Sequence, residues 1–153
     1  MQIGDIFEFR TGFREGKYIA EIRSAQPEMR GEDLRGVRLR LRLMGQDGME
    51  RERTEVLFFY NQNGTPARGA RIFAAIVGIT GVDRKFLTED LTLEEFIKQV
   101  IMNKNLKLIR NLCIQLEEKS IGIEYERQKS DNRFRIKKVG KITSDEFSNI
   151  VPF

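Results

Sequence analysis

The sequence predicts a mainly β fold with a helical insertion, and three observations support this prediction. Strand-like stretches precede residue 62, helix-like stretches fill the middle, and two more strand-like stretches follow up to residue 140. Five strands with a helical element after the third is the order of an OB-fold, a small five-stranded barrel. We therefore expect an OB-fold domain over residues 1–140 with helices at about 66–118 between strands 3 and 4, then a C-terminal tail at 141–153. Other small α+β barrels fit the same order.

The first three strands follow from alternation and turn residues. Segment 16–26 is rich in β-forming residues and ends before Pro27, after which a polar, glycine-containing loop continues to residue 36. The stretch "GVRLRLRLMG" (36–45) alternates arginine with leucine. This period of two predicts a strand, because a helix would distribute the arginines around its whole surface. Asp47-Gly48 is a hairpin signal, which makes 51–61 the third strand.

The middle of the chain carries helical signals. "ARIFAAIVG" (70–78) is compact, contains alanine and ends at a glycine. Thr92 and Glu95 form a capping box at the start of a second helix. Apolar residues at helical spacing predict a third helix over 105–118, with Cys113 on its core-facing side.

Composition excludes several classes of function. The 153 residues suit one domain, and a net charge of +4 with a pI near 9.3 favours a polyanionic partner. Histidine is absent and Cys113 is the single cysteine, so Cys/His zinc sites, histidine-based catalysis and an intrachain disulfide are excluded. No apolar run approaches the roughly 18 residues of a membrane span, and no signal-peptide pattern is present. We expect a cytoplasmic protein with no cofactor and no membrane association.

Three arginines share one face of the second strand. Side chains two apart on a strand lie about 6.7 Å apart on the same side, so Arg38, Arg40 and Arg42 repel one another. A two-residue turn at Asp47-Gly48 sets the register. It places these arginines opposite Leu57, Glu55 and Arg53, with Phe59 on the same side. If the turn is one residue longer, Phe58 and Tyr60 replace Phe59 on the arginine side.

The last two strands repeat this basic pattern. "IGIEYERQ" (121–128) and "RFRIKKVG" (133–140) flank a turn at Asp131-Asn132. Tyr125 and Ile123 then share a face with Phe134 and Ile136, and Arg133, Arg135 and Lys137 point to the other face near Glu124 and Glu126. The loops that hold ligands in OB-folds contribute Arg30, Arg35 and Lys129.

Cations interleaved with an aromatic ring are what a single-strand binding surface needs, because cations bind phosphates and a ring stacks on a base. The predicted DNA-binding residues are Arg35, Arg38, Arg40, Arg42, Arg53, Phe59, Lys129, Arg133, Arg135 and Lys137. The alternative is that both strands are solvated edges whose charge prevents aggregation.

The order of these elements resembles the single-stranded-DNA-binding proteins encoded by tailed bacteriophages. The likeness covers roughly residues 14–140. It rests on "GKY" in the first strand, the alternating strand, the glycine turn, a strand ending in aromatics ("VLFFYN"), "AAIVGITG" and the final hairpin. The helical insertion is longer than in that family. The resemblance implies an OB-fold and a non-enzymatic role on single-stranded DNA in phage replication, recombination or repair, in the host cytoplasm.

The C-terminal residues add a second resemblance. "SDEFSNIVPF" looks like the acidic tips of bacterial single-stranded-DNA-binding proteins, which dock on replication and repair enzymes. The corresponding residues are Asp145, Glu146, Ile150, Pro152 and Phe153. The segment either docks on such partners or packs on its own domain.

Two other function classes are open at this level. One is a protein-binding OB adaptor without nucleic-acid binding. The other is a metal-dependent nuclease built on Glu117 and Lys119 with Glu28, Glu50 or Asp83, although a helical 105–118 does not suit such a site. Near the N-terminus, Phe7, Phe9 and Phe13 would cap the barrel or mediate a homodimer.

Overall fold

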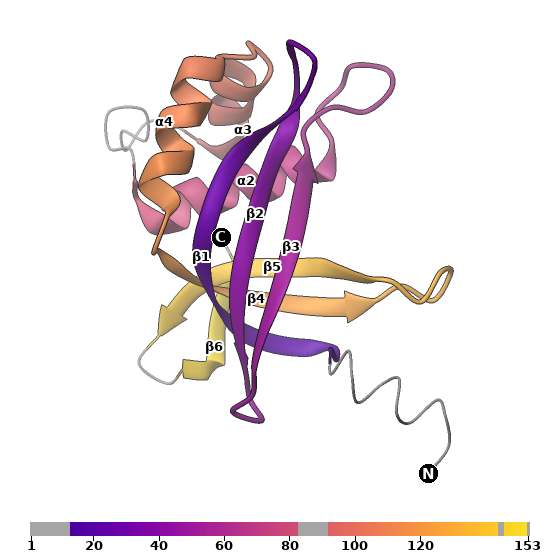
Figure 1. The fold of residues 1–153 in the computed structure, drawn as a ribbon, viewed down its shortest axis with the longest axis vertical. Coiled ribbons are helices and arrows are strands. Elements are labelled where there is room, and N and C mark those ends of the chain that lie inside the picture. Colours follow the sequence, from indigo (N-terminus) through magenta and orange to yellow (C-terminus); the bar gives the residue numbers. More distant parts are fainter. Residues whose placement is uncertain (1–12, 83–91, 144–145, 153) are drawn as a thin grey trace.

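A computed structural model describes residues 13–82, 92–143 and 146–152, and its centre is one antiparallel sheet (Figure 1). The six strands lie in the order β3-β2-β1-β4-β5-β6. The strands are β1 (Gly16–Arg30), β2 (Asp33–Gly45), β3 (Glu50–Phe58), β4 (Ser120–Arg127), β5 (Phe134–Thr143) and β6 (Glu146–Pro152). The helices are α2 (Arg68–Thr80), α3 (Leu93–Phe96), the π-helix η1 (Ile97–Ile101) and α4 (Leu106–Leu116).

The predicted fold class is confirmed in its main features. All five predicted strands form, and the helices lie between the third and fourth of them in sequence. Within the described residues no strand pairing joins β3 to β5, so hydrogen bonds do not close the sheet into a barrel, although its order is OB-like. Figure 1 shows β4 and β5 crossing the direction of β1, β2 and β3 steeply, with α2 behind these three strands.

The β1–β2 hairpin is longer than the alternation predicts. The expected loop from Pro27 to residue 36 is wrong, because β1 continues to Arg30 and β2 begins at Asp33. Gly31, at φ 63°, makes the tight turn between them. Proline is tolerated here because β4 pairs with β1 only over residues 16–21, which leaves the far edge of β1 without a strand at Pro27.

The register of β2 against β3 differs by one residue from the first expectation. Arg42 lies opposite Glu52, Arg40 opposite Thr54 and Arg38 opposite Val56. The loop is one residue longer than an Asp47-Gly48 turn, with Gly48 at φ 78° and Gly45 N–H donating to the Met49 carbonyl over 3.2 Å. The alternative register, which places Phe58 on the arginine side, is therefore the one observed.

This register reverses two predicted site residues. Phe59 is completely buried against Phe73, with ring centroids 5.3 Å apart, and is not on the arginine face. Arg53 also turns inward. Phe58 is 54 % exposed instead. Tyr60 donates its hydroxyl to the Ile101 carbonyl over 2.6 Å and packs on the helices.

The helical region follows the capping signals. Thr92 Oγ1 accepts from the backbone N–H of Glu95 over 3.2 Å, as the capping box predicts, and the Asn105 side chain caps α4. α2 continues past Gly78 and ends at Gly81, at φ 62°. Cys113 is buried as predicted, and burial raises the pKa of its thiol to about 12. No helix in the described part of the chain is long and apolar enough to cross a membrane.

Two glycines allow α2 and β2 to approach β3 closely. A Cβ at Gly36 would lie 2.0 Å from the Leu57 carbonyl oxygen, and one at Gly69 would lie 2.3 Å from that of Phe58. No side chain fits at either position. The start of α2 is therefore held against the end of β3.

Residues 141–153, predicted as a tail after the last strand, contain strand residues. β5 runs to Thr143, and β6 pairs with it through Gly140↔Pro152 and Lys141↔Val151. A free edge of β5 offers hydrogen bonds that β6 can take. Glu146, Ile150 and Pro152 lie in β6. Asp145, Phe153, Phe7, Phe9 and Asp83 lie outside the described residues.

Candidate nucleic-acid interface

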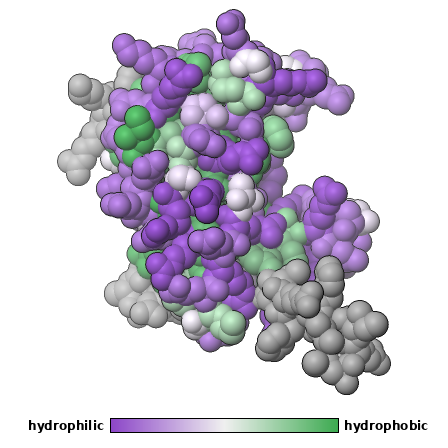
Figure 2. All heavy atoms as spheres, viewed as in Figure 1, coloured by the Kyte–Doolittle hydropathy of each residue, from purple (hydrophilic) through white to green (hydrophobic). Residues whose placement is uncertain are grey.

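Carboxylates neutralise two of the three arginines on the outer face of β2. Arg38 donates from Nε and Nη2 to Oε2 of Glu28, over 3.0 and 2.7 Å. Arg42 donates to both carboxylate oxygens of Glu50, over 3.1 and 2.5 Å, and this contact raises the pKa of Arg42. These pairs offset the repulsion along the strand. Figure 2, seen from the same side as Figure 1, shows mostly hydrophilic residues over β1, β2 and β3.

Arg53 has a structural position between β3 and β5. Its guanidinium donates to Glu55 over 2.5 Å and to the Phe134 carbonyl over 3.1 Å. It also lies 4.4 Å from the ring centroid of Phe13 and 5.2 Å from that of Tyr125. Arg53 therefore connects strands that share no backbone hydrogen bonds, and its Nε and Nη2 donors are used within the fold.

The β4–β5 hairpin carries cations that ion pairs do not neutralise. The predicted two-residue turn at Asp131-Asn132 is wrong: the Gln128 N–H donates to the Arg133 carbonyl, so the turn spans 129–132. The register shifts by two, which keeps the predicted faces, and Tyr125 and Ile136 lie opposite each other and are buried. Arg135 pairs with Glu126 over 2.5 Å, which lowers the pKa of Glu126, and Lys137 pairs with Glu124 over 3.5 Å. Five further cations of 127–141 have no ion pair to any described residue: Arg127, Lys129, Arg133, Lys138 and Lys141. We call residues 127–141 the basic hairpin.

A groove joins the basic hairpin to the end of β3. Its volume is about 360 Å³, and Phe58, Arg68, Phe134 and Arg135 are among the residues that line it. We call it the Phe58 groove. Arg68 donates to the Ile136 carbonyl, and burial followed by repulsion from Arg135 lowers the pKa of Arg68. The groove therefore combines an exposed ring with two neighbouring guanidinium groups.

The remaining predicted cations lie at two separate places. Arg35 is a residue of β2 rather than of a loop, and it lies 3.5 Å from Asp33. Asp33 also lies 3.4 Å from the Lys104 ammonium. Lys129 is exposed in the turn of the basic hairpin.

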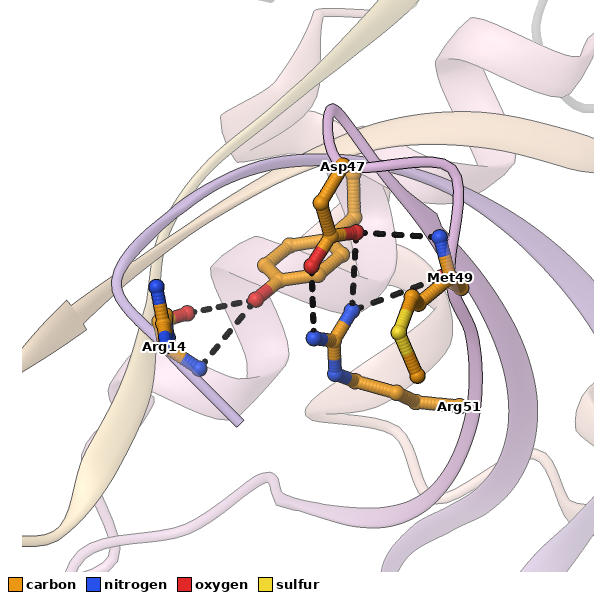
Figure 3. Close-up of polar contacts among 5 residues, drawn as sticks. Arg14, Asp47, Met49 and Arg51 are labelled. Carbon is orange, nitrogen blue, oxygen red and sulfur yellow. Dashed lines mark hydrogen bonds and ion pairs between the residues drawn. The ribbon is translucent and has the colours of Figure 1, made fainter. Parts of the chain in front are cut away.

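The β2–β3 loop is fixed by a network beside the start of β1 (Figure 3). Asp47 accepts from Arg51 over 2.8 Å and from the backbone N–H of Met49 over 3.0 Å, and these bonds lower the pKa of Asp47 to about 2. The Tyr18 hydroxyl donates to the Arg14 carbonyl over 2.6 Å. The first two bonds fix the loop between β2 and β3, and the third fixes the start of β1 beside it.

Asp47 gives the fold a predictable acid dependence. Its pKa is about 2 in the folded chain and about 3.9 when unfolded, so its contribution is complete above the unfolded value and lost as the pH falls through 2. Urea unfolding of the wild type and Asp47→Asn should show the wild type more stable at pH 5 to 7, with the difference vanishing near pH 2. A difference that is constant with pH would contradict the ionic role.

The described carboxylates do not assemble a metal site. Among these residues, no group of three possible metal ligands lies together. Glu28 and Glu50 are occupied by Arg38 and Arg42, and Glu117 is the C-cap of α4.

The comparisons with known proteins add no relative. No family model matches the chain, and no curated protein matches it.

The sequence did not indicate Arg68 as a groove residue, and it left open whether Phe58 or Phe59 lies on the arginine side. Arg68 follows the turn "NQNGTP" and carries no local signal, because only the packing of α2 on β3 brings it to β5. The face on which Phe58 lies depended on the register of β2 against β3, and the two possible registers differ by one residue.

Proposed function

We propose that this chain binds single-stranded DNA, without catalysis, through the Phe58 groove and the basic hairpin. The observation that carries the proposal is an exposed aromatic ring in a groove with Arg68 and Arg135, continuous with a hairpin whose further cations lack ion pairs to the described residues. A ring stacks on a base of any sequence, and cations track the phosphates. Duplex DNA does not present unstacked bases to such a ring.

The OB-like strand order supports an OB-fold as the scaffold for this interface. In this proposal Arg53 of β3 and Arg68 of α2 hold β5 beside β3, where a closed barrel would have backbone hydrogen bonds. The resemblance to phage single-stranded-DNA-binding proteins supports a role in replication, recombination or repair in the host cytoplasm. It also makes DNA, rather than RNA, the first ligand to test.

Fluorescence anisotropy with labelled oligo-dT tests the proposal. The wild type should bind oligo-dT more tightly than duplex, with affinity that falls steeply with salt. Replacing Arg127, Lys129 and Arg133 with alanine should weaken binding and reduce the log–log salt slope by about 2, since each phosphate contact on a single strand contributes about 0.7.

A matched triple variant distinguishes an effect of these particular cations from an effect of the protein's net charge. Replacing Lys98, Lys107 and Arg110, three exposed cations of the helical region, removes the same charge and should leave the slope nearly unchanged. Equal losses in both triple variants, or wild-type binding that is insensitive to salt, would contradict the proposed interface.

Docking of the C-terminal residues on replication or recombination proteins stays a prediction. Because Glu146–Pro152 forms β6, a partner that captures these residues has to compete with β5 for their backbone hydrogen bonds.

A further inference from the structure

A β-bulge in β1 places two consecutive side chains on the outer face. Ile22 lies opposite Leu41 and Ser24 lies opposite Arg40, so Arg23 is an extra residue in β1. Ile22 and Ala25 are buried on the inner side. Arg23 and Ser24 therefore both face outward beside Arg40, where regular alternation would have turned Ser24 inward.

Arg40 is the centre of a row of donors across three strands. Ser24 of β1 and Thr54 of β3 are its direct neighbours on either side. The row lies in a hollow of about 300 Å³ on the outer face. The lining residues are Arg23, Ser24, Arg40, Leu41, Glu52, Arg53 and Thr54. Two hydroxyls flanking one guanidinium match a tetrahedral phosphate, which accepts hydrogen bonds on several oxygens.

The charges of this face distinguish Arg40 from its neighbours on β2. Arg38 and Arg42 have Glu28 and Glu50, whereas Arg40 has no ion pair to any described residue. The other arginines of the hollow also have their own carboxylates, Glu21 for Arg23 and Glu55 for Arg53.

The carboxylate in the hollow belongs to Glu52, which lies opposite Arg42 rather than Arg40. Its charge acts with that of hydrogen-bonded Glu50 to raise the pKa of Arg42. Among the arginines of β2, Arg40 is therefore the one whose guanidinium has no carboxylate partner among the described residues and can bind an external anion.

We infer that Ser24, Arg40 and Thr54 form a phosphodiester subsite, a second anchor for the bound strand. This inference rests on the proposed single-strand binding. Thr54 and Phe58 share the outer face of β3 and are about 13 Å apart along the strand. A strand that stacks on Phe58 therefore reaches Arg40 by following β3.

Variants within the same face test the subsite. Arg40→Ala should weaken oligo-dT binding about tenfold and lower the salt slope by about 0.7. The double variants Glu28→Gln/Arg38→Gln and Glu50→Gln/Arg42→Gln each remove an ion pair at constant net charge and should bind within about twofold of the wild type. Lys98→Ala, with the same charge change at a remote place, should do the same.

A variant without the two hydroxyls distinguishes a site with defined hydrogen bonds from general attraction by positive charge. Ser24→Ala/Thr54→Val changes no charge and should weaken binding about threefold at an unchanged salt slope. Wild-type affinity in this variant, or an Arg40→Ala loss no larger than that of Lys98→Ala, would overturn the inference while leaving the proposed function intact.

Inorganic phosphate tests the same atoms without DNA. In ¹⁵N-resolved NMR spectra, phosphate should shift the Nε–Hε signal of Arg40 and leave those of Arg38 and Arg42 in place. If oligo-dT does not bind the wild type, the proposed function fails. A shifted Arg40 signal then supports an anion site without a strand, and an unshifted one overturns the subsite as well.

Discussion

Phe59→Ala is expected to destabilise the fold by about 3–5 kcal/mol, whereas Phe58→Ala should leave stability nearly unchanged and weaken oligo-dT binding by about 1–3 kcal/mol. The two rings are adjacent in sequence and opposite in environment. Phe59 is completely buried beside Phe73, and its removal leaves a cavity. Phe58 is 54 % exposed in the groove, so its ring is free to stack on a base.

Urea unfolding followed by circular dichroism measures the first effect, and anisotropy measures the second. Phe58→Leu serves as a control, because it keeps an apolar side chain and removes the aromatic face. Its affinity should resemble that of Phe58→Ala. If Phe58→Leu binds like the wild type, the ring does not stack on a base.

Arg53→Met is expected to lose about 3 kcal/mol of stability, because it leaves the carboxylate of Glu55 uncompensated at 15 % exposure. The Phe134 carbonyl also loses its donor, and the rings of Phe13 and Tyr125 lose their cation. Arg42→Met removes a cation from an exposed pair and should change stability little.

A double variant makes this expectation sharper. Arg53→Met/Glu55→Leu replaces the whole pair with apolar groups and should recover much of the lost stability. Hydrogen exchange should report faster exchange at the start of β5 in the single variant. If Arg53→Met keeps full stability and instead weakens DNA binding, Arg53 is a phosphate ligand and the observed register of β3 is wrong.

The sequence predicted elements better than it predicted which side chains share a face. Alternation in β2 and the capping box at Thr92 are local signals, and both were confirmed. The β2–β3 register depended on one loop residue, which Gly48 accommodates at positive φ. That single step exchanged Phe58 with Phe59 and moved Arg53 inward.

The sequence predicted the positive charge of the candidate interface, but it did not predict the groove. The basic hairpin kept its faces because its longer turn shifts the register by two residues, an even number, which leaves Tyr125 and Ile136 pointing inward. The Phe58 groove needs Arg68, which only the close approach of α2 at Gly69 brings to β5. β6 escaped prediction because its β-forming residues do not alternate strictly.

β3 and β5 are in contact through side chains and share no backbone ladder. In a barrel closed by backbone hydrogen bonds, almost any residue leaves the bonds in place, so closure is insensitive to sequence. Here Arg53 of β3 and Arg68 of α2 donate to carbonyl groups of β5, so a single substitution removes either contact. Substitutions at these two positions should therefore change how firmly β5 is held against β3 and α2 while every strand is kept.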